Sequence, residues 1–167
     1  MAEKETIFSS KVQYGGIFSF KEFYKFCHAW ILEEMGMDIS ETKYEEKIAG
    51  DMKNIIVKWK CTKKVTDYFK FEIEVNFKIE KLTNIEINEG GAKIATNKGT
   101  VSVEVKGDLV RDYQGKFELS AFNKFLRSTY EKWVIPARVE EYAGKLAQSC
   151  DEFLAQAKAY LDLEGRK

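Results

Sequence analysis

The sequence contains few of the residues on which metal sites and acid–base catalysis depend. His28 is the only histidine, and the three cysteines, Cys27, Cys61 and Cys150, are far apart and form no C-x-x-C pair. Zinc sites need closely spaced cysteine and histidine ligands, and acid–base catalysis needs a side chain with a positioned partner. We therefore expect no metal, no cofactor and reduced cysteines in the core, and we rank an enzymatic role behind a binding or an assembly role.

Net charge and long apolar runs are lacking as well. The 27 basic and 27 acidic residues cancel, so no overall field attracts nucleic acid or an anionic membrane. No segment approaches the roughly 18 uncharged apolar residues of a membrane span. Residues 1–5 lack the apolar core of a signal peptide. These absences predict a cytoplasmic protein without a nucleic-acid partner and without integral membrane association.

Proline is scarce, and no proline-rich or glycine-rich linker divides the chain. The single proline, Pro136, stands between two stretches of helical periodicity, and neither an internal repeat nor a low-complexity tract is present. A chain of 167 residues is long enough to bury a core of its own. We therefore expect a single domain over residues 1–167.

Strand-like alternation is plentiful, and it is clearest between residues 68 and 80. From Phe69 to Ile79 every odd position is Phe, Ile or Val, and every even position is Lys, Glu or Asn. Successive side chains of a strand point to opposite faces, so the segment predicts a long strand with one apolar and one charged face. The rest of the chain must then supply a cover for the apolar face.

Weaker alternation predicts further strands, separated by a break at Gly15 and Gly16 and by turns at 50–51, 88–91 and 97–99. They are expected at residues 5–14, 42–49, 54–63, 82–87, around Ile94 and at 101–110. Strands 54–63 and 68–80 should pair as a hairpin. Opposite charges favour the register that places Lys58 opposite Glu74 and Lys60 opposite Glu72.

Helical periodicity marks the segments before and after this run of strands. Ser19 and Glu22 have the spacing of a capping box, and Gly36 is placed to end the helix that follows, so a helix is expected at 19–35. After Gly115 the apolar period changes from two to 3.6. This change predicts a helical segment at 117–134 and, from Pro136, a long terminal helix at 137–163.

The resulting element order indicates an α+β fold and resembles the helix-grip fold of START-like lipid-transfer and polyketide-cyclase proteins. The resemblance rests on the early helix at 19–35, the strands between Tyr44 and Val110, and the terminal helix from Pro136 to Leu163. It implies a curved antiparallel sheet of about six to seven strands that grips the C-terminal helix, with an N-terminal helix after the first strand. It also implies an apolar ligand held between helix and sheet. The chain is similar, too, to small uncharacterised archaeal proteins, which implies no activity.

Inward-facing apolar side chains supply the candidate ligand site. Six of them are expected to surround the space under the terminal helix: Trp59, Phe71, Ile73, Val103, Tyr142 and Phe153. Residues of these types line pockets for apolar ligands, and they equally fill solid cores. The leading hypothesis is a non-enzymatic domain that binds a hydrophobic small molecule or lipid between the sheet and the C-terminal helix. The alternative is a protein-interaction or assembly module that forms a homodimer or larger homo-oligomer through an edge strand or the 117–134 helix.

Overall fold

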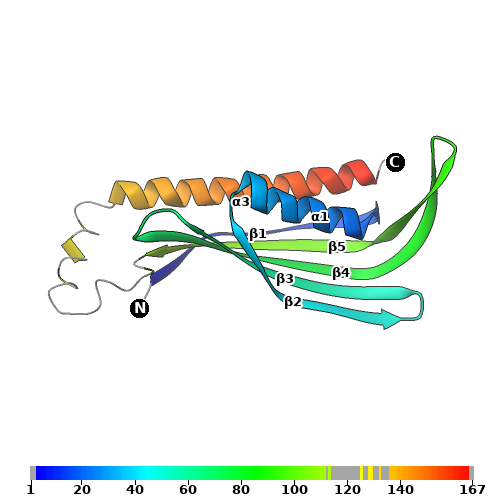
Figure 1. The fold of residues 1–167 in the computed structure, drawn as a ribbon, viewed down its shortest axis with the longest axis horizontal. Helices are drawn as coiled ribbons and strands as arrows, with labels where there is room; N and C mark the ends of the chain where they lie inside the picture. The colour runs from blue at the N-terminus through cyan, green and yellow to red at the C-terminus, as the bar shows by residue number, and fades with distance from the viewer. Residues whose placement is uncertain are drawn as a thin grey trace.

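The fold is α+β, with one antiparallel sheet that carries helices on one of its faces (Figure 1). The computed structural model describes residues 3–111, 113, 125, 128, 129, 132 and 136–165. The elements within these residues are β1 (Glu3–Phe18), α1 (Phe20–Ala29), the π-helical turn η1 (Trp30–Glu34), β2 (Asp38–Ala49), β3 (Met52–Lys64), β4 (Phe69–Glu89), β5 (Ala92–Arg111) and α3 (Pro136–Glu164). The sheet order is β1-β5-β4-β3-β2, so consecutive strands β2 to β5 are neighbours and β1 joins beside β5.

The described residues form five strands rather than the six to seven expected, because two predicted interruptions lie inside continuous strands. The segments at 68–80 and 82–87 belong to the single strand β4, which has an irregularity between Glu80 and Thr83 with Lys81 at φ 56°. The residues around Ile94 and those at 101–110 belong to β5. In β5 a local turn signal at 97–99 was overridden, because Asn97 and Lys98 have ladder partners in both β1 and β4.

Gly99 shows why residues 97–99, which were expected to form a turn, continue the strand β5. It pairs with Gly16 of β1, so the glycine pair that was expected to end the first strand is also inside the sheet. A Cβ atom at Gly99 would lie 3.0 Å from the carbonyl oxygen of Glu80 and 3.1 Å from the Cα of Leu82. The irregularity of β4 thus brings its backbone against β5, and glycine serves this close approach rather than a turn.

The register predicted for the hairpin of β3 and β4 is wrong by two residues along β4. Lys60 faces Glu74, Lys58 faces Asn76, and Trp59 faces Val75. The connecting turn sets this register, because the Thr66 side chain accepts hydrogen bonds from the backbone N–H groups of Tyr68 and Phe69 at 3.1 and 3.0 Å. Turn geometry therefore outweighs one cross-strand charge pair.

Helix α1 follows the first strand, as expected, but it is shorter than the predicted 19–35. Ser19 is its N-cap, and the Ser19 side chain accepts a hydrogen bond from the Glu22 N–H at 3.4 Å. After Ala29 the helix continues as the π-helical turn η1, and Gly36 follows at φ 63°, the left-handed conformation expected of it. The buried side chains Phe23, Cys27 and Ile31 face the sheet.

The long helix α3 lies along the same face of the sheet, here called the inner face (Figure 1). Its apolar stripe is buried there, namely Tyr142, Leu146, Cys150, Phe153, Leu154, Ala157 and Leu161. At Gly107 of β5 an added Cβ would lie 3.0 Å from Cys150 Sγ, so α3 passes close to the strand where the side chain is smallest. Most of the helical segment predicted at 117–134 lies outside the described residues.

Candidate functional site

The six side chains predicted to surround a ligand are all buried on the inner face or on α3. Ile73 and Phe153 are brought together, with Ile31 and Val105, around a narrow space that has no room for a water molecule. Trp59 packs against Phe77, with ring centroids 4.8 Å apart. Tyr142 packs against Phe69 at 5.1 Å. The described residues around Ile73 therefore form a packed core, while a ligand role for these six side chains stays a prediction.

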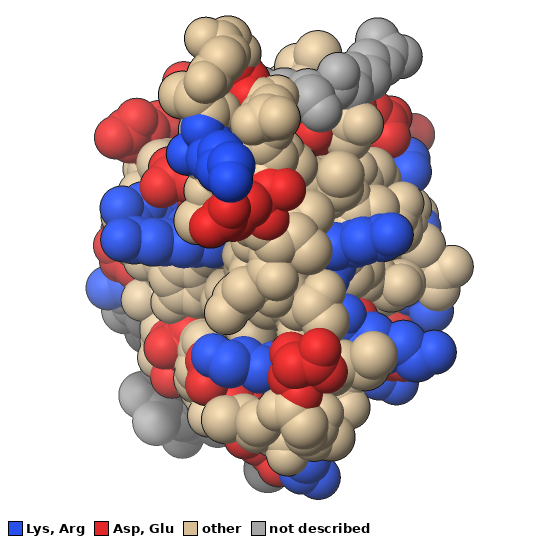
Figure 2. Space-filling model, turned by 90° about the vertical axis from the view of Figure 1, so that its right-hand side faces the viewer, with Lys and Arg blue, Asp and Glu red and all other residues tan. Residues whose placement is uncertain are grey.

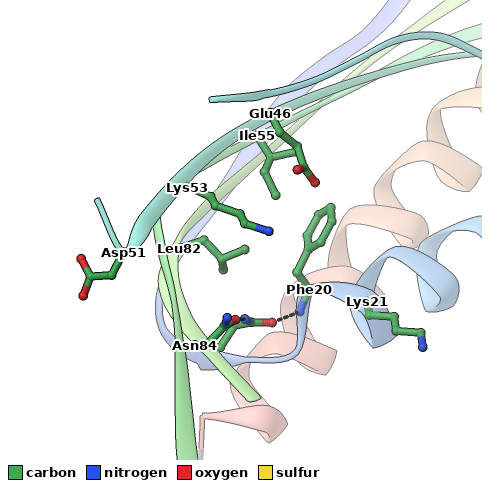
Figure 3. A pocket seen from close by; sticks show the side chains of 9 residues that line it. Phe20, Lys21, Glu46, Asp51, Lys53, Ile55, Leu82 and Asn84 are labelled. Atoms are coloured by element: carbon green, nitrogen blue, oxygen red, sulfur yellow. Dashed lines mark hydrogen bonds between the residues drawn. The ribbon is translucent and has the colours of Figure 1, made fainter. Parts of the chain in front are cut away.

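An open groove lies next to this core, between α1 and the strands β2 and β3. Its wider part has a volume of about 390 Å³ and is lined by Phe20, Lys21, Tyr24, Lys25 and Tyr44. Phe20 and Lys21 also line an adjoining hollow of about 160 Å³, which extends to Glu46, Asp51, Lys53, Ile55, Leu82, Asn84 and Asn97 (Figure 3). We call the two parts together the α1–β2 groove.

Two irregularities in the strands turn the lining side chains of the groove inward. The ladder of β2 and β3 shifts between Glu41 and Lys43, so that Tyr44 pairs with Val57 and Glu46 with Ile55 on the inner face. The register shift in β4 between Glu80 and Thr83 likewise turns the Leu82 side chain to the inner face. A bulge moves every later side chain to the opposite face, which is why alternation along the sequence does not reveal these residues.

The amino end of α1 is tied to the sheet at the bottom of the groove. The Phe20 N–H donates to Asn97 Oδ1 at 3.1 Å, and Asn97 Nδ2 donates to Asn84 Oδ1 at 2.8 Å. In Figure 3 the Phe20 ring stands between α1 and the strand that carries Ile55 and Lys53. Asn97 was expected in a turn, and its place in β5 is what allows it to hold the helix.

A hydrogen-bonded aromatic cluster surrounds Tyr24, which lines the groove. The Tyr24 hydroxyl donates to Glu41 Oε1 at 2.7 Å, and Trp59 Nε1 donates to the same oxygen at 3.3 Å. His28 stacks on the Tyr24 ring at 6.3 Å. Burial raises the pKa of Tyr24, and the hydrogen bond to Glu41 raises it further. Tyr24 is therefore protonated near neutral pH and acts as a hydrogen-bond donor, not as a base.

Cationic side chains predominate around the apolar part of the groove. Lys21 and Lys25 lie one turn apart on α1, and both are exposed. Lys53 reaches from β3 toward the Phe20 ring, and its ammonium group makes no hydrogen bond or ion pair with any described residue (Figure 3). On the opposite wall the Glu46 carboxylate accepts a hydrogen bond from the Tyr44 hydroxyl at 2.7 Å. The wider part of the groove thus combines an aromatic lining with two lysines, whereas the adjoining hollow carries Lys53 together with Glu46 and Asp51.

The three cysteines, Cys27, Cys61 and Cys150, are buried and free. Burial raises the pKa of Cys61 and of Cys150 to about 12, and that of Cys27 well above its ordinary value. These thiols are not ionised near neutral pH, so they are poor nucleophiles. Among the described residues no three His, Cys, Asp or Glu side chains gather in a way that suits a metal ion.

The surface at the end of the molecule where β2 turns into β3 and β4 turns into β5 carries charges of both signs. Figure 2 views this end and shows Lys and Arg side chains interspersed with Asp and Glu, with uncharged surface between them. None of the described helices has the length and apolar character needed to cross a membrane. Comparison with models of known protein families, with curated proteins and with solved structures finds no match.

Proposed function

We propose that the protein binds a hydrophobic small molecule of lipid type in the α1–β2 groove, and that it acts as a binding domain rather than an enzyme. The observation that carries this proposal is the hollow of about 390 Å³ lined by Phe20, Tyr24 and Tyr44. Its volume lies within the range typical of small-molecule sites, and its lining is mostly aromatic, as such sites usually are.

The lysines of the groove favour a ligand with an anionic head and an apolar tail. The tail would lie along the aromatic floor, and its carboxylate or phosphate would meet the ammonium groups of Lys21, Lys25 and Lys53. The Tyr24 hydroxyl is committed to Glu41 at 2.7 Å, so the lysines are the principal donors open to the ligand. A charged hydrogen bond is roughly twice as strong as a neutral one, which makes the head group the main source of specificity.

The helix-grip resemblance supports the same proposal. A first strand, a helix, a run of hairpins and a long terminal helix occur here in that order, with β1 beside the last strand of the sheet. Helix-grip proteins usually hold an apolar ligand between helix and sheet. We place the ligand at the mouth of that space, beside α1, because the described residues around Ile73 and Phe153 leave no room for it.

Calorimetric titration with decanoate tests the proposal directly, with decyltrimethylammonium as a probe that has the same tail and the opposite charge. We expect decanoate to bind and the cationic probe to bind at least about tenfold more weakly, which corresponds to about 1.4 kcal/mol. Failure of decanoate to bind, or equal binding of the two probes, would contradict a site for an anionic amphiphile.

Two substitutions locate the site. Tyr44→Asp places a carboxylate in the apolar floor and should reduce decanoate affinity by about tenfold or more. Ile94→Asp is its control, because Ile94 is similarly exposed but lies on β5, outside the lining of the groove. Equal affinities of the two variants would place the ligand elsewhere.

A further inference from the structure

The two edges of the sheet are not equally protected. At the β1 edge, Lys158 of α3 donates to the backbone carbonyl of Gln13 at 2.8 Å, and α3 packs along the strand. At the other edge, β2 pairs with β3 on one side, and no described strand pairs with it on the other (Figure 1). An unpaired edge offers a row of backbone donors and acceptors to another strand.

The exposed part of β2 also carries apolar side chains. Tyr44 is 46% exposed and Ile48 is 69% exposed, and both lie on the inner face beside the groove. They stand in the regular stretch 43–49, which begins after the irregularity at Glu41 and Lys43 and ends at the turn to β3. A regular, partly apolar edge strand of this kind is suited to pairing with another strand.

The stretch 43–49 is complementary to a second copy of itself. In an antiparallel pair with a two-fold axis at its central residue, Glu46, position 44 faces position 48 and position 45 faces position 47. Tyr44 then meets Ile48 of the partner subunit, and Glu45 meets Lys47 of the partner subunit, and symmetry produces each contact twice. Opposite charges and apolar pairs directly across two strands both stabilise pairing.

Other symmetric registers fit less well. An axis at Glu45 would place Lys43 opposite Lys47 of the partner subunit. An axis at Lys47 would bring two Lys47 side chains together, as the axis at Glu46 does with Glu46, but without Glu45–Lys47 pairs to offset the repulsion. An axis at Tyr44 would draw in Glu41, which already accepts hydrogen bonds from Tyr24 and Trp59. That register would also cross the ladder irregularity between Glu41 and Lys43. Charge therefore disfavours the axes at Glu45 and Lys47. An axis at Tyr44 would place Lys43 opposite Glu45 of the partner subunit, so strand regularity is what favours the axis at Glu46 over it.

We propose that two copies of this chain associate through β2, in antiparallel register about Glu46, to form one continuous sheet. The contact is short, so association is reversible and depends on protein concentration. Two Glu46 carboxylates face each other at the axis and weaken the pair. Tyr44 also lines the groove, so Ile48 of the partner subunit adds to the groove rim. This last consequence rests on the proposed ligand site, whereas the association itself does not.

Sedimentation equilibrium of the ligand-free protein over a concentration series tests the association. We expect the average mass of the wild type to rise toward that of a dimer. Glu45→Lys and Lys47→Glu each turn two attractive contacts into repulsive ones and should lower the association constant by about tenfold or more. Mixing these two variants makes both contacts attractive again, so the mixture should form a heterodimer that neither variant forms alone.

Lys43→Glu is the matched control. Lys43 and Lys47 both pair with Glu45 within the chain, at 3.3 and 3.5 Å, so the two substitutions disturb the monomer alike. In the proposed register Lys43 faces Ala49 of the partner subunit, and its reversal should leave association unchanged. Glu46→Gln should strengthen association, because it removes the like charges at the axis. Urea unfolding of each variant checks that its fold is intact.

A wild type that stays monomeric throughout the series overturns the proposal. Two results would overturn the register about Glu46. One is that Lys43→Glu weakens the dimer as much as Lys47→Glu does. The other is that a mixture of Glu45→Lys and Lys47→Glu forms no heterodimer. Decanoate titration is carried out separately at a concentration where the protein is monomeric. Loss of ligand binding there contradicts the groove and leaves the result on association intact.

Discussion

The inner face of the sheet has two parts that differ in what covers them. In the covered part, α3 and η1 pack on Ile73, Val75 and Val105, and no water fits between them. In the open part, α1 leaves the groove above Ile55 and Leu82, and Tyr44 remains 46% exposed. The inner face thus forms solid core in one place and a candidate binding surface in the other, where irregularities in β2 and β4 reverse the alternation.

The largest difference between the two parts should appear when one isoleucine is shortened in each. Ile73→Ala in the covered part should lower the free energy of unfolding by about 2–5 kcal/mol, because it leaves a cavity in a packed core. Ile48→Ala in the open part should change it by less than about 0.5 kcal/mol, since that side chain is 69% exposed. Urea denaturation measures both, and similar losses would show that the two parts are packed alike.

The outer face behind the covered part should respond to pH more than the rest of the sheet. Burial raises the pKa of Glu72, but hydrogen bonds from Lys4 at 2.7 Å and Lys70 at 3.0 Å lower it by more, so the net shift is downward. The stabilisation that results is complete above the pKa of unfolded glutamate, about 4.3, and is lost as the pH falls through the lower folded value.

Glu72→Gln should therefore cost about 1–3 kcal/mol near neutral pH, and the difference from the wild type should shrink below about pH 4. Glu80→Gln on the same strand is the control, because the ion pair of Glu80 with Lys78 at 3.3 Å is exposed and should contribute less than about 1 kcal/mol. Urea midpoints measured from pH 3 to pH 8 compare the two variants. If the loss of stability in Glu72→Gln does not depend on pH, the ion pairs of Glu72 with Lys4 and Lys70 are contradicted.

A smaller effect is expected at the border between the two parts, where α1 begins. Ser19→Ala removes the N-cap bond to the Glu22 N–H and should cost about 1 kcal/mol of stability. It should also weaken decanoate binding, because Phe20 and Lys21 line the groove on the first turn of this helix. Ser40→Ala, at an exposed position of β2, should change neither quantity. Unchanged unfolding and binding in Ser19→Ala would show that the cap does not hold this wall of the groove.

Much of the covered part could be predicted from the sequence, whereas little of the open part could. The odd-numbered side chains from Phe69 to Ile79 are buried as their alternation predicts, and so is the stripe on α3. The groove residues Tyr44 and Leu82 were missed, because each follows an irregularity that reverses the face of its strand. Charge pairing likewise misplaced the register of β3 and β4, since the bonds of Thr66 in the turn were not visible in any periodicity.

The sequence by itself determined the α+β class, the inner face of the central strand, the cap of α1 and the apolar stripe of α3, because each depends on residues that are near neighbours along the chain. Only the tertiary structure decided where strands continue through glycines and where the strand faces reverse. It also decided which part of the inner face is covered. These features depend on contacts between distant segments, such as Gly99 with Gly16 and Asn97 with α1. A strand passes through a local turn signal when partners on both sides supply its backbone hydrogen bonds.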